Sequence, residues 1–377
     1  MSNALINPSL LSWARQRAGL SEMDVAKSIP VRPEKVYEWE AGQSLPTFKQ
    51  AQKWAALAHI PFGFLFLKEP PAEQVPLPDL RTVGNAAFER PSPELLDIVK
   101  DVLRKQEWYL DYLKENNAEP LQFIGKYGLN SSVKEVAIDI RATLKIQDLA
   151  PRLNYDEYLR SLIEAAESVG ILVMRSGIVG SNTRRKLEVS EFRGFAISDK
   201  FAPVIFINIS DAPTARLFTL VHELAHLWIG STGISNVDVN NHRKEEIFCN
   251  AVAGEFLVPE KPFRALWNEE AAWDDNLPPL TDHFRVSRLV IARRAYDLGF
   301  ISKKDYSDFY LAELKAFQNS DGGGGNFYRN ATSKNSKIFS RAILSETLSG
   351  RVLLRDAAKL LGMQPSHIRT FASTFKE

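Results

Sequence analysis

The sequence has one cysteine, no long apolar run and almost no net charge. One cysteine among 377 residues excludes an internal disulfide, a usage that fits a reducing cytoplasm. No apolar stretch approaches the length of a membrane span, so no membrane association is expected. With 47 basic and 46 acidic residues, the net charge of +1 gives no overall attraction to nucleic acid or to a membrane surface. Function must therefore be sought in local motifs.

The first residues also lack the basic head and apolar run of a secretion signal, which predicts a cytoplasmic protein. The content of 45% hydrophobic and 25% charged residues is typical of a globular protein. A chain of 377 residues has room for two or three domains.

The most informative motif is His-Glu-Leu-Ala-His at residues 222–226. The chain has only six histidines, and two of them stand four apart here. On a helix, His222 and His226 lie one turn apart on the same face, so both imidazoles can reach one metal ion. Glu223 then lies beside the metal site, where it can act as general base. The pattern is typical of zinc-assisted peptide hydrolysis and predicts one zinc ion.

Residues 214–230 have the apolar spacing of a helix, which we expect to end at Gly230. The apolar residues that we expect to pack into a core are Leu217, Leu220, Val221, Leu224 and Trp228. The two histidines and Glu223 project from another side of such a helix. The alternative, two surface histidines with a solvated glutamate between them, does not explain this stripe.

A catalytic zinc needs a third protein ligand. The best candidate, Glu246, lies twenty residues after the motif in a second predicted helix that ends before Pro259. Asn250 stands four residues after Glu246, so it faces the same way and would orient a metal-ligating histidine by a hydrogen bond. The alternatives for the third ligand are Glu245, Glu255 and His242. The apolar residues expected to bury this helix are Ile247, Val252, Phe256 and Leu257.

The sequence HELAH, followed by E-x-x-C-N-A-V-A-G-E-F-L-V-P, resembles the ImmA/IrrE family of bacterial and phage zinc metallo-endopeptidases. The resemblance covers about residues 153–301. It implies that His222, His226 and Glu246 bind zinc, that Glu223 is the base and that Asn250 supports a ligand. Cys249 and Gly254 stand where the family usually has a small residue such as alanine. The resemblance also implies a zincin-like α+β domain that cleaves or inactivates a transcriptional repressor.

Two short apolar runs precede the motif, at residues 191–197 and 204–209, and predict strands separated by a turn. Metallopeptidases of this kind bind substrate backbone as an extra strand on an exposed sheet edge. Either run could supply that edge, and an ordinary buried hairpin is the alternative. No residue stands out as a stabiliser of the transition state, because His242, His283 and several tyrosines all qualify.

The N-terminal region has helical patterns at residues 22–28, 32–39 and 48–58. Ser21 is placed to cap the first of these, and Gly42 to end the second. Two short helices joined by a tight turn predict a helix-turn-helix, in which the second helix enters the DNA major groove.

This region resembles the Xre/Cro-type repressor domain over about residues 10–67. The residues that carry the resemblance are Ala14, Arg15, Gly19, Leu20, Ser21, Val25, Ala26, Val36, Trp39, Glu40, Gly42, Pro46 and Thr47. It implies that Arg32, Glu34, Lys35 and Tyr37 lie near base edges or phosphates. Residues 1–68 hold eight basic and five acidic residues, a modest net charge of +3. Protein interaction is therefore the alternative role of this region.

We therefore expect a multidomain, mainly α chain of four regions. They are an all-α helix-turn-helix domain (1–68), a linker and helical region (69–152), the α+β zincin-like metallopeptidase domain (153–301) and a C-terminal helical region with a glycine-rich loop (302–377). The last region has basic residues that could touch DNA or an acidic partner, namely Arg341, Arg351, Arg355, Lys359 and Arg369. A packed helical cap is the alternative.

Two functions fit these expectations. In the first, the chain is a zinc endopeptidase whose N-terminal module brings it to operator DNA or to a repressor, in a stress, phage or mobile-element response. In the second, it is a DNA-binding regulator or an antitoxin for a toxin encoded nearby, and its peptidase domain is a sensor or scaffold. Glu223 favours the first, because a scaffold has no need of a general base.

Overall fold

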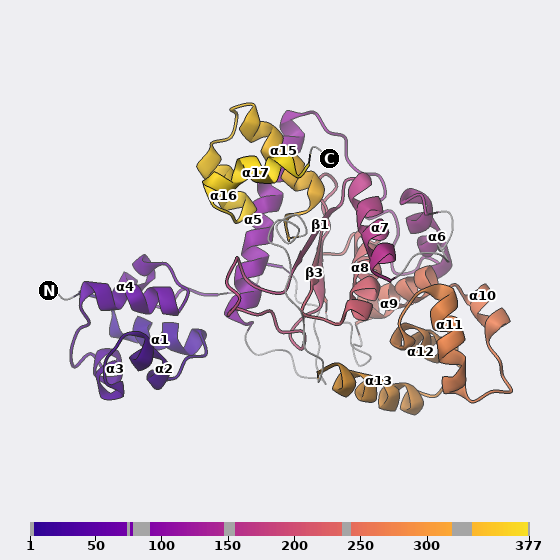
Figure 1. Ribbon diagram of the computed structural model, residues 1–377, viewed down its shortest axis with the longest axis horizontal. Coiled ribbons are helices and arrows are strands. Elements are labelled where there is room, and N and C mark those ends of the chain that lie inside the picture. Colours follow the sequence, from indigo (N-terminus) through magenta and orange to yellow (C-terminus); the bar gives the residue numbers. More distant parts are fainter. Residues whose placement is uncertain are drawn as a thin grey trace. The chain divides into compact units, whose positions relative to one another are not determined.

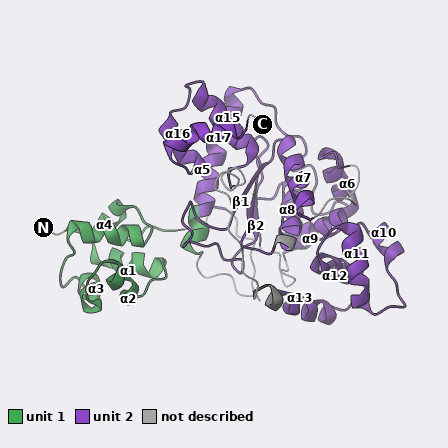
Figure 2. Ribbon diagram, in the orientation of Figure 1, with its two compact units in different colours: residues 1–75, 90–97 green, residues 76–89, 98–377 purple. Residues whose placement is uncertain are grey.

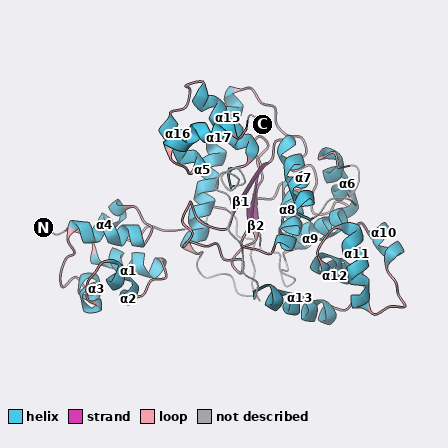
Figure 3. Cartoon of the chain, in the orientation of Figure 1, coloured by secondary structure: helices cyan, strands magenta, loops and turns pink. Residues whose placement is uncertain are grey.

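The computed structural model describes residues 4–73, 76–77, 91–146, 155–235, 243–318 and 334–375 (Figure 1). The chain divides into two compact units, one of residues 1–75 and 90–97 and one of residues 76–89 and 98–377 (Figure 2). It is mainly helical, with one small mixed sheet in the second unit (Figure 3). This agrees with the predicted mainly α, multidomain chain. No helix in the described ranges is long and apolar enough to cross a membrane.

The first unit is built from short helices that begin at capping residues. The Ser21 side chain accepts a hydrogen bond from the Asp24 N–H, and the Asp24 carboxylate accepts one from the Ser21 N–H. The elements are α1 (Pro8–Arg17), α2 (Glu22–Ser28), α3 (Pro33–Glu40), α4 (Phe48–Leu57) and the 3-10 helix η1 (Phe62–Phe66). The helices predicted here from the sequence are confirmed to within one residue at each end.

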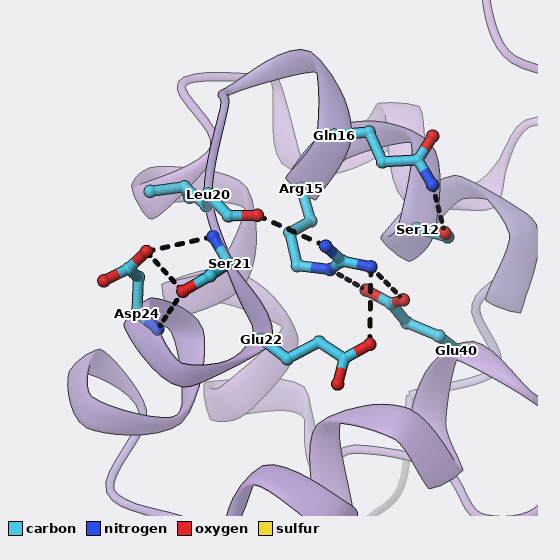
Figure 4. A network of polar contacts seen from close by, with 8 residues as sticks. All are labelled: Ser12, Arg15, Gln16, Leu20, Ser21, Glu22, Asp24 and Glu40. Carbon is cyan, nitrogen blue, oxygen red and sulfur yellow. Dashed lines mark hydrogen bonds and ion pairs between the residues drawn. The ribbon is translucent and has the colours of Figure 1, made fainter.

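A charged residue, Arg15 on α1, ties these helices together beneath the surface (Figure 4). Its Nε and Nη2 atoms donate to the two Glu40 carboxylate oxygens, at 2.6 and 2.8 Å, and Nη1 donates to the Leu20 carbonyl at 3.2 Å. Trp39 and Trp54 pack edge to face in the core, with ring centroids 6.1 Å apart. Apolar burial and a bidentate ion pair thus hold α1, α3 and α4.

The sheet of the second unit has the strand order β1-β3-β2-β4. Its strands are β1 (Leu172–Ser176), β2 (Gly194–Ile197), β3 (Val204–Asn208) and β4 (Gly233–Ser235). Strand β1 runs parallel to β3, and β2 runs antiparallel to both β3 and β4. The two predicted strands are therefore the interior pair, and every residue of both is buried. Of the two alternatives left open by the sequence, the buried hairpin is the one found, because β1 and β4 pair with the outer sides of β3 and β2.

The helix with the two histidines, α8 (Pro213–Trp228), packs between the sheet and α9 (Lys244–Leu257). On this side of the sheet lie also α6 (Val133–Thr143), against α9, and α7 (Tyr155–Ser168), against β1 and α8 (Figure 1). All five residues of the predicted apolar stripe of α8 are fully buried. Gly230, with φ 69°, takes the left-handed conformation just after the helix, as its predicted end requires.

The remaining helices extend this unit on both sides. Residues after α9 form α10 (Glu260–Leu266), η2 (Trp273–Asn276), α11 (Leu277–Phe284), α12 (Arg288–Asp297) and α13 (Lys303–Gln318). The unit is completed by the long helix α5 (Pro93–Glu115) from Ile98 onward and by the C-terminal elements α15 (Lys337–Leu348), α16 (Leu354–Leu361), η3 (Pro365–His367) and α17 (Ile368–Ser373).

The C-terminal elements are packed against the rest of the second unit. Phe339 of α15 contacts the rings of Trp108 and Tyr109 on α5. The buried Glu167 of α7 accepts hydrogen bonds from the Ser336 hydroxyl and the Lys337 N–H. The structure thus supports a packed helical cap. The predicted glycine-rich loop at 322–325 and most of the proline-rich linker lie outside the described residues.

Candidate metal centre

Three predicted ligand side chains meet between α8 and α9. The Nε2 atoms of His222 and His226 are 3.0 Å apart. Glu246 of α9 places Oε2 3.3 Å from His222 Nε2 and Oε1 3.1 Å from His226 Nε2. Among the described residues, these three form the one group of at least three His, Cys, Asp or Glu side chains arranged to hold a metal ion. Two neighbouring helices thus bring three ligand atoms to one point.

The ligand cluster, His222, His226 and Glu246, is buried completely. Burial by itself raises the pKa of the Glu246 carboxyl, but the two histidines outweigh it and hold that pKa at about 2. Burial lowers the pKa of His226, against the opposing effect of Glu246. An ionised carboxylate beside a neutral imidazole is the protonation state in which these side chains bind metals.

The spacing of the ligand atoms fits zinc. Two nitrogens bound to one tetrahedral zinc at about 2.0 Å lie about 3.3 Å apart. The three separations in the cluster, from 3.0 to 3.3 Å, are close to that value. Within the described part of the chain, neither histidine Nδ1 has a hydrogen-bond partner. A donor set of two imidazoles and one carboxylate is also that of many catalytic zinc sites.

Glu223, the predicted base, is fully buried next to the cluster. Neither of its carboxylate oxygens has a hydrogen-bond partner among the described residues. Burial, and then the charge of Glu246, raise the pKa of Glu223 well above its ordinary value. A Cβ atom on Gly194 of β2 would stand 2.9 Å from Glu223 Oε1, from the Phe206 carbonyl oxygen and from a methyl group of Thr219. The absence of a side chain at Gly194 therefore leaves room for the Glu223 carboxylate.

Ser235, the last residue of β4, touches the cluster and was not identified from the sequence. Its hydroxyl lies 3.3 Å from His226 Nε2 and donates to Glu246 Oε1 at 3.3 Å. A strand of three residues, Gly233–Ser235, has no measurable alternation of apolar and polar residues, so no sequence pattern indicated it. The serine adds a hydroxyl that holds the ligating carboxylate in place.

The other residues proposed near the metal are placed differently. Asn250 is buried one turn after Glu246, but its Oδ1 has no hydrogen-bond partner in the described ranges, so the predicted bond to a histidine is not formed here. Glu255 pairs with Arg294 of α12. Glu245 is half-exposed and outside the cluster. His242 lies outside the described residues. Ile247, predicted to be buried, is 52% exposed, because it lies on the outer face of α9.

The four residues predicted to contact DNA lie in the first unit, on α3 and at its N-terminus. Arg32 is the N-cap residue of α3, and it is exposed together with Glu34 and Tyr37. Lys35 pairs with Glu38 at 2.6 Å and keeps 43% of its side chain exposed. A shallow groove beside this helix is lined by Ala26, Lys27, Pro30, Val31, Arg32 and Lys35. The groove carries three basic side chains and no acidic one.

Comparison with known families adds two findings. Residues 166–296 match a peptidase family whose description is IrrE N-terminal-like domain. Residues 335–374 match a family described only as a domain of unknown function, DUF8813. No match was found among curated proteins or among solved structures. The first match runs from the end of α7 into α12 and includes α8, α9 and the ligand cluster. The part of the chain that holds the buried His-His-Glu cluster is therefore similar to the IrrE N-terminal-like domain of a peptidase family.

Proposed function

We propose that this protein is a zinc-dependent endopeptidase in which His222, His226 and Glu246 hold one zinc ion. The observation that carries the proposal is the convergence of these three ligand atoms beside a carboxylate that has no partner of its own among the described residues. When bound, zinc supplies a Lewis acid that polarises the scissile carbonyl and lowers the pKa of water. The peptidase family that matches residues 166–296 supports the same reaction class.

Glu223 is the group of this chain that would move protons. Its carboxylate would accept a proton from the attacking water and deliver it to the nitrogen of the leaving amine. Gly194, which has no side chain, leaves the carboxylate the space that a Cβ atom there would take. Ser235 would hold Glu246 in the orientation needed for binding. Burial of the site excludes bulk water and strengthens every electrostatic interaction within it.

Replacing Glu223 by glutamine tests this assignment, because glutamine keeps the size of the side chain and cannot accept the proton. The Glu223→Gln protein should retain zinc and lose peptide cleavage by about a thousandfold. The matched control is Glu245→Gln, a change of the same chemistry on α9 outside the cluster, which should cleave like the wild type. Equal cleavage by the two variants would reject the role of Glu223.

We also propose that the first unit is a helix-turn-helix module that binds operator DNA, with α3 as the helix that enters the major groove. Arg32, Lys35 and Tyr37 would contact phosphates or base edges, and Glu34 would lie among them. The support is the exposure of these side chains and the basic groove beside them. A module of this kind would place the peptidase near a DNA-bound repressor, whose cleavage or inactivation is the proposed output in a stress, phage or mobile-element response.

The alternative function, a DNA-binding regulator or antitoxin that pairs with a toxin encoded nearby, keeps the first unit and makes the second a sensor or scaffold. Binding of the full chain to a randomised duplex DNA pool, read by sequencing, separates these roles. The double variant Arg32→Ala, Lys35→Ala should lose the enriched sequences, and Glu223→Gln should keep them. A regulator that needs no proteolysis would keep its biological output in Glu223→Gln; a peptidase would lose it.

A further inference from the structure

A second feature of the active-site helix is a pocket one turn before the ligand cluster. Helix α8 contributes Ala215, Phe218 and Thr219 to its wall. Residues three, four, seven and eight apart share one face of a helix. Phe218 stands four residues before His222, and Thr219 four before Glu223, so the pocket lies on the metal-facing side of α8. The rings of Phe218 and His222 are stacked, with centroids 6.5 Å apart.

The sheet joins the pocket to the metal centre at a second point. Arg193 lines the pocket, and the next residue, Gly194, lies against the Glu223 carboxylate. Thr219 both lines the pocket and approaches Gly194. A peptide whose scissile bond lies beside Glu223 would therefore have an adjacent side chain within reach of this pocket.

The pocket is lined by cationic side chains at one side and by apolar side chains at the other. Its lining includes two guanidinium groups, Arg193 and Arg293, and no carboxylate. The carboxylates that pair with these arginines come from Asp211, 3.5 Å from Arg193, and Asp297, 2.9 Å from Arg293, and both lie outside the lining. The aliphatic side chains of Leu289 and Val290 on α12 form the apolar part.

Two tyrosines of α13 complete the polar side. The Tyr310 hydroxyl accepts a hydrogen bond of 2.8 Å from Arg193 Nη2. The Arg293 guanidinium lies over the ring of Tyr306, 5.9 Å from its centroid. These contacts fix the two arginines, so their charges are oriented before any ligand binds and little conformational entropy is lost on binding.

We propose that this pocket binds the side chain of a glutamate in the peptide substrate, next to the bond that is cleaved. The inference rests on the proposed peptidase function and names its substrate class: a protein segment with an acidic residue beside the scissile bond. The carboxylate would pair with Arg193 and Arg293 and accept from a tyrosine hydroxyl. The methylene groups of glutamate would lie against Phe218, Leu289 and Val290. A lysine would place an unpaired ammonium group beside two guanidinium groups and is excluded.

Peptide binding tests the pocket without any turnover. Zinc-loaded, immobilised full-length protein with Glu223→Gln is exposed to a degenerate octapeptide library with acetylated N-termini and amidated C-termini, so that acidic groups come only from side chains. Mass spectrometry then measures the composition of the retained peptides. Peptides with glutamate should be retained about tenfold over their glutamine counterparts, the ratio expected for a charge-assisted hydrogen bond. Retention without acidic preference, or no retention of any peptide, would overturn the proposal.

A charge reversal in the pocket assigns the preference to this site. Leu289 is half-buried at the pocket and has no role in the ligand cluster. Leu289→Glu places a carboxylate among the guanidinium groups and should abolish the glutamate preference and raise retention of lysine peptides. The same change at Leu311, an exposed leucine of α13 outside the pocket lining, should keep the glutamate preference. If both variants still select glutamate, acidic peptides bind elsewhere, for instance at the basic groove of the first unit, and the pocket assignment is wrong.

Cleavage of the same library by the wild-type protein separates the two proposals. If glutamate peptides are retained, if Leu289→Glu reverses that preference and if no peptide is cleaved, the peptidase function is rejected and the pocket remains the binding site for the glutamate side chain. Cleavage at sites with no acidic residue at a fixed distance from the cut would support the peptidase function and reject the pocket. Cleavage with glutamate at one fixed position supports both.

Discussion

Each unit contains ionisable side chains that are partly or fully buried, but the two units differ in how these side chains are hydrogen-bonded. In the first unit, one edge of the Arg15 guanidinium group donates both of its hydrogen bonds to the Glu40 carboxylate, and Nη1 donates to the Leu20 carbonyl (Figure 4). In the metal centre, both oxygens of Glu223 and Oε2 of Glu246 have no hydrogen-bond partner within the described ranges, and the Nε2 atoms of His222 and His226 converge beside them. The first arrangement is complete without a ligand, and the second is not.

We interpret this difference as that between an ion pair that stabilises the fold and side chains that await a ligand. A buried polar atom without a partner costs about 1–3 kcal/mol of stability, so a cluster of them is retained where a ligand satisfies them. The unpartnered buried atoms in the described part of the first unit are Nη1 of Arg17 and the indole nitrogens of Trp39 and Trp54, all of them donors. In the metal centre, the unpartnered atoms are carboxylate oxygens of Glu223 and Glu246, beside the point where the two histidine Nε2 atoms meet. The comparison predicts that stability of the second unit, and not of the first, depends on zinc.

Loss of a metal ligand should give the largest effect. The His226→Ala protein is expected to fall from about one zinc per chain to a small fraction, because two ligands remain where a catalytic zinc needs three. At free zinc a thousandfold above its dissociation constant, the wild type should gain about 4 kcal/mol of stability that the variant lacks. Elemental analysis and thermal unfolding with and without chelator measure both. His283→Ala, at an exposed histidine of α11, is the control and should behave as wild type.

Removal of Arg15 should destabilise the first unit by about 2–3 kcal/mol, because Glu40, with 9% of its side chain exposed, would be left without its cation. Denaturant unfolding measures the loss, which should be the same with zinc and with chelator. Lys35→Ala breaks an exposed ion pair in the same unit and should change stability by less than about 0.5 kcal/mol. If the stability lost in Arg15→Ala differed between zinc and chelator, the stability of the first unit would also depend on zinc, and the proposed difference between the two units would be wrong.

Gly194→Ala should cost about 2 kcal/mol and reduce cleavage, because the added methyl group meets the Glu223 carboxylate and a strand carbonyl at 2.9 Å. Zinc content should be unchanged, since the three ligands lie on other elements. Gly128→Ala is the control, because a Cβ there meets no atom within 4 Å. If the two variants cleave equally well, Gly194 does not position the base.

The smallest effect is expected at the start of α2, where Ser21→Ala removes the N-cap at a cost of about 1 kcal/mol. The Ser21 side chain and backbone hydrogen bonds lower the pKa of Asp24 from its ordinary 3.8. A group with a lowered pKa contributes stability above its unfolded value and loses it as pH falls through the folded value. The difference between variant and wild type should therefore shrink below about pH 4. A difference independent of pH from 2 to 7, read in unfolding curves, would exclude the Ser21–Asp24 pairing.

Local patterns were enough to predict the helices and the ligand cluster. Capping residues and the spacing of apolar side chains define α2 and α8, and the i, i+4 rule brings His222 to His226. The position of Glu246 followed from helix spacing together with the family resemblance. Each of these features depends on residues close in sequence, so the chain itself displays them.

What could not be predicted depends on residues far apart in sequence. Strand order is set by pairing between β1 and β3, about thirty residues apart, so the sequence could not decide between a buried and an exposed position for β2 and β3. The contacts of Ser235 and Gly194 with the site arise from that same sheet. Ile247 lies on an exposed face of α9, so its apolar side chain led to a wrong prediction of burial. The pocket beside α8 joins residues of α12 and α13 to Arg193, which directly precedes β2, and has no local signature.

The central claim is that the unpartnered groups between α8 and α9 are a zinc site with a His-His-Glu ligand set. X-ray absorption at the zinc edge of the purified full-length protein tests it most directly, because it reports which atoms surround the metal. The account predicts nitrogen and oxygen neighbours at about 2.0–2.2 Å and no sulfur. Cys249, buried on α9 three residues after Glu246, is the one cysteine of the chain. A sulfur neighbour at about 2.3 Å, or a protein that binds no zinc, would contradict the account.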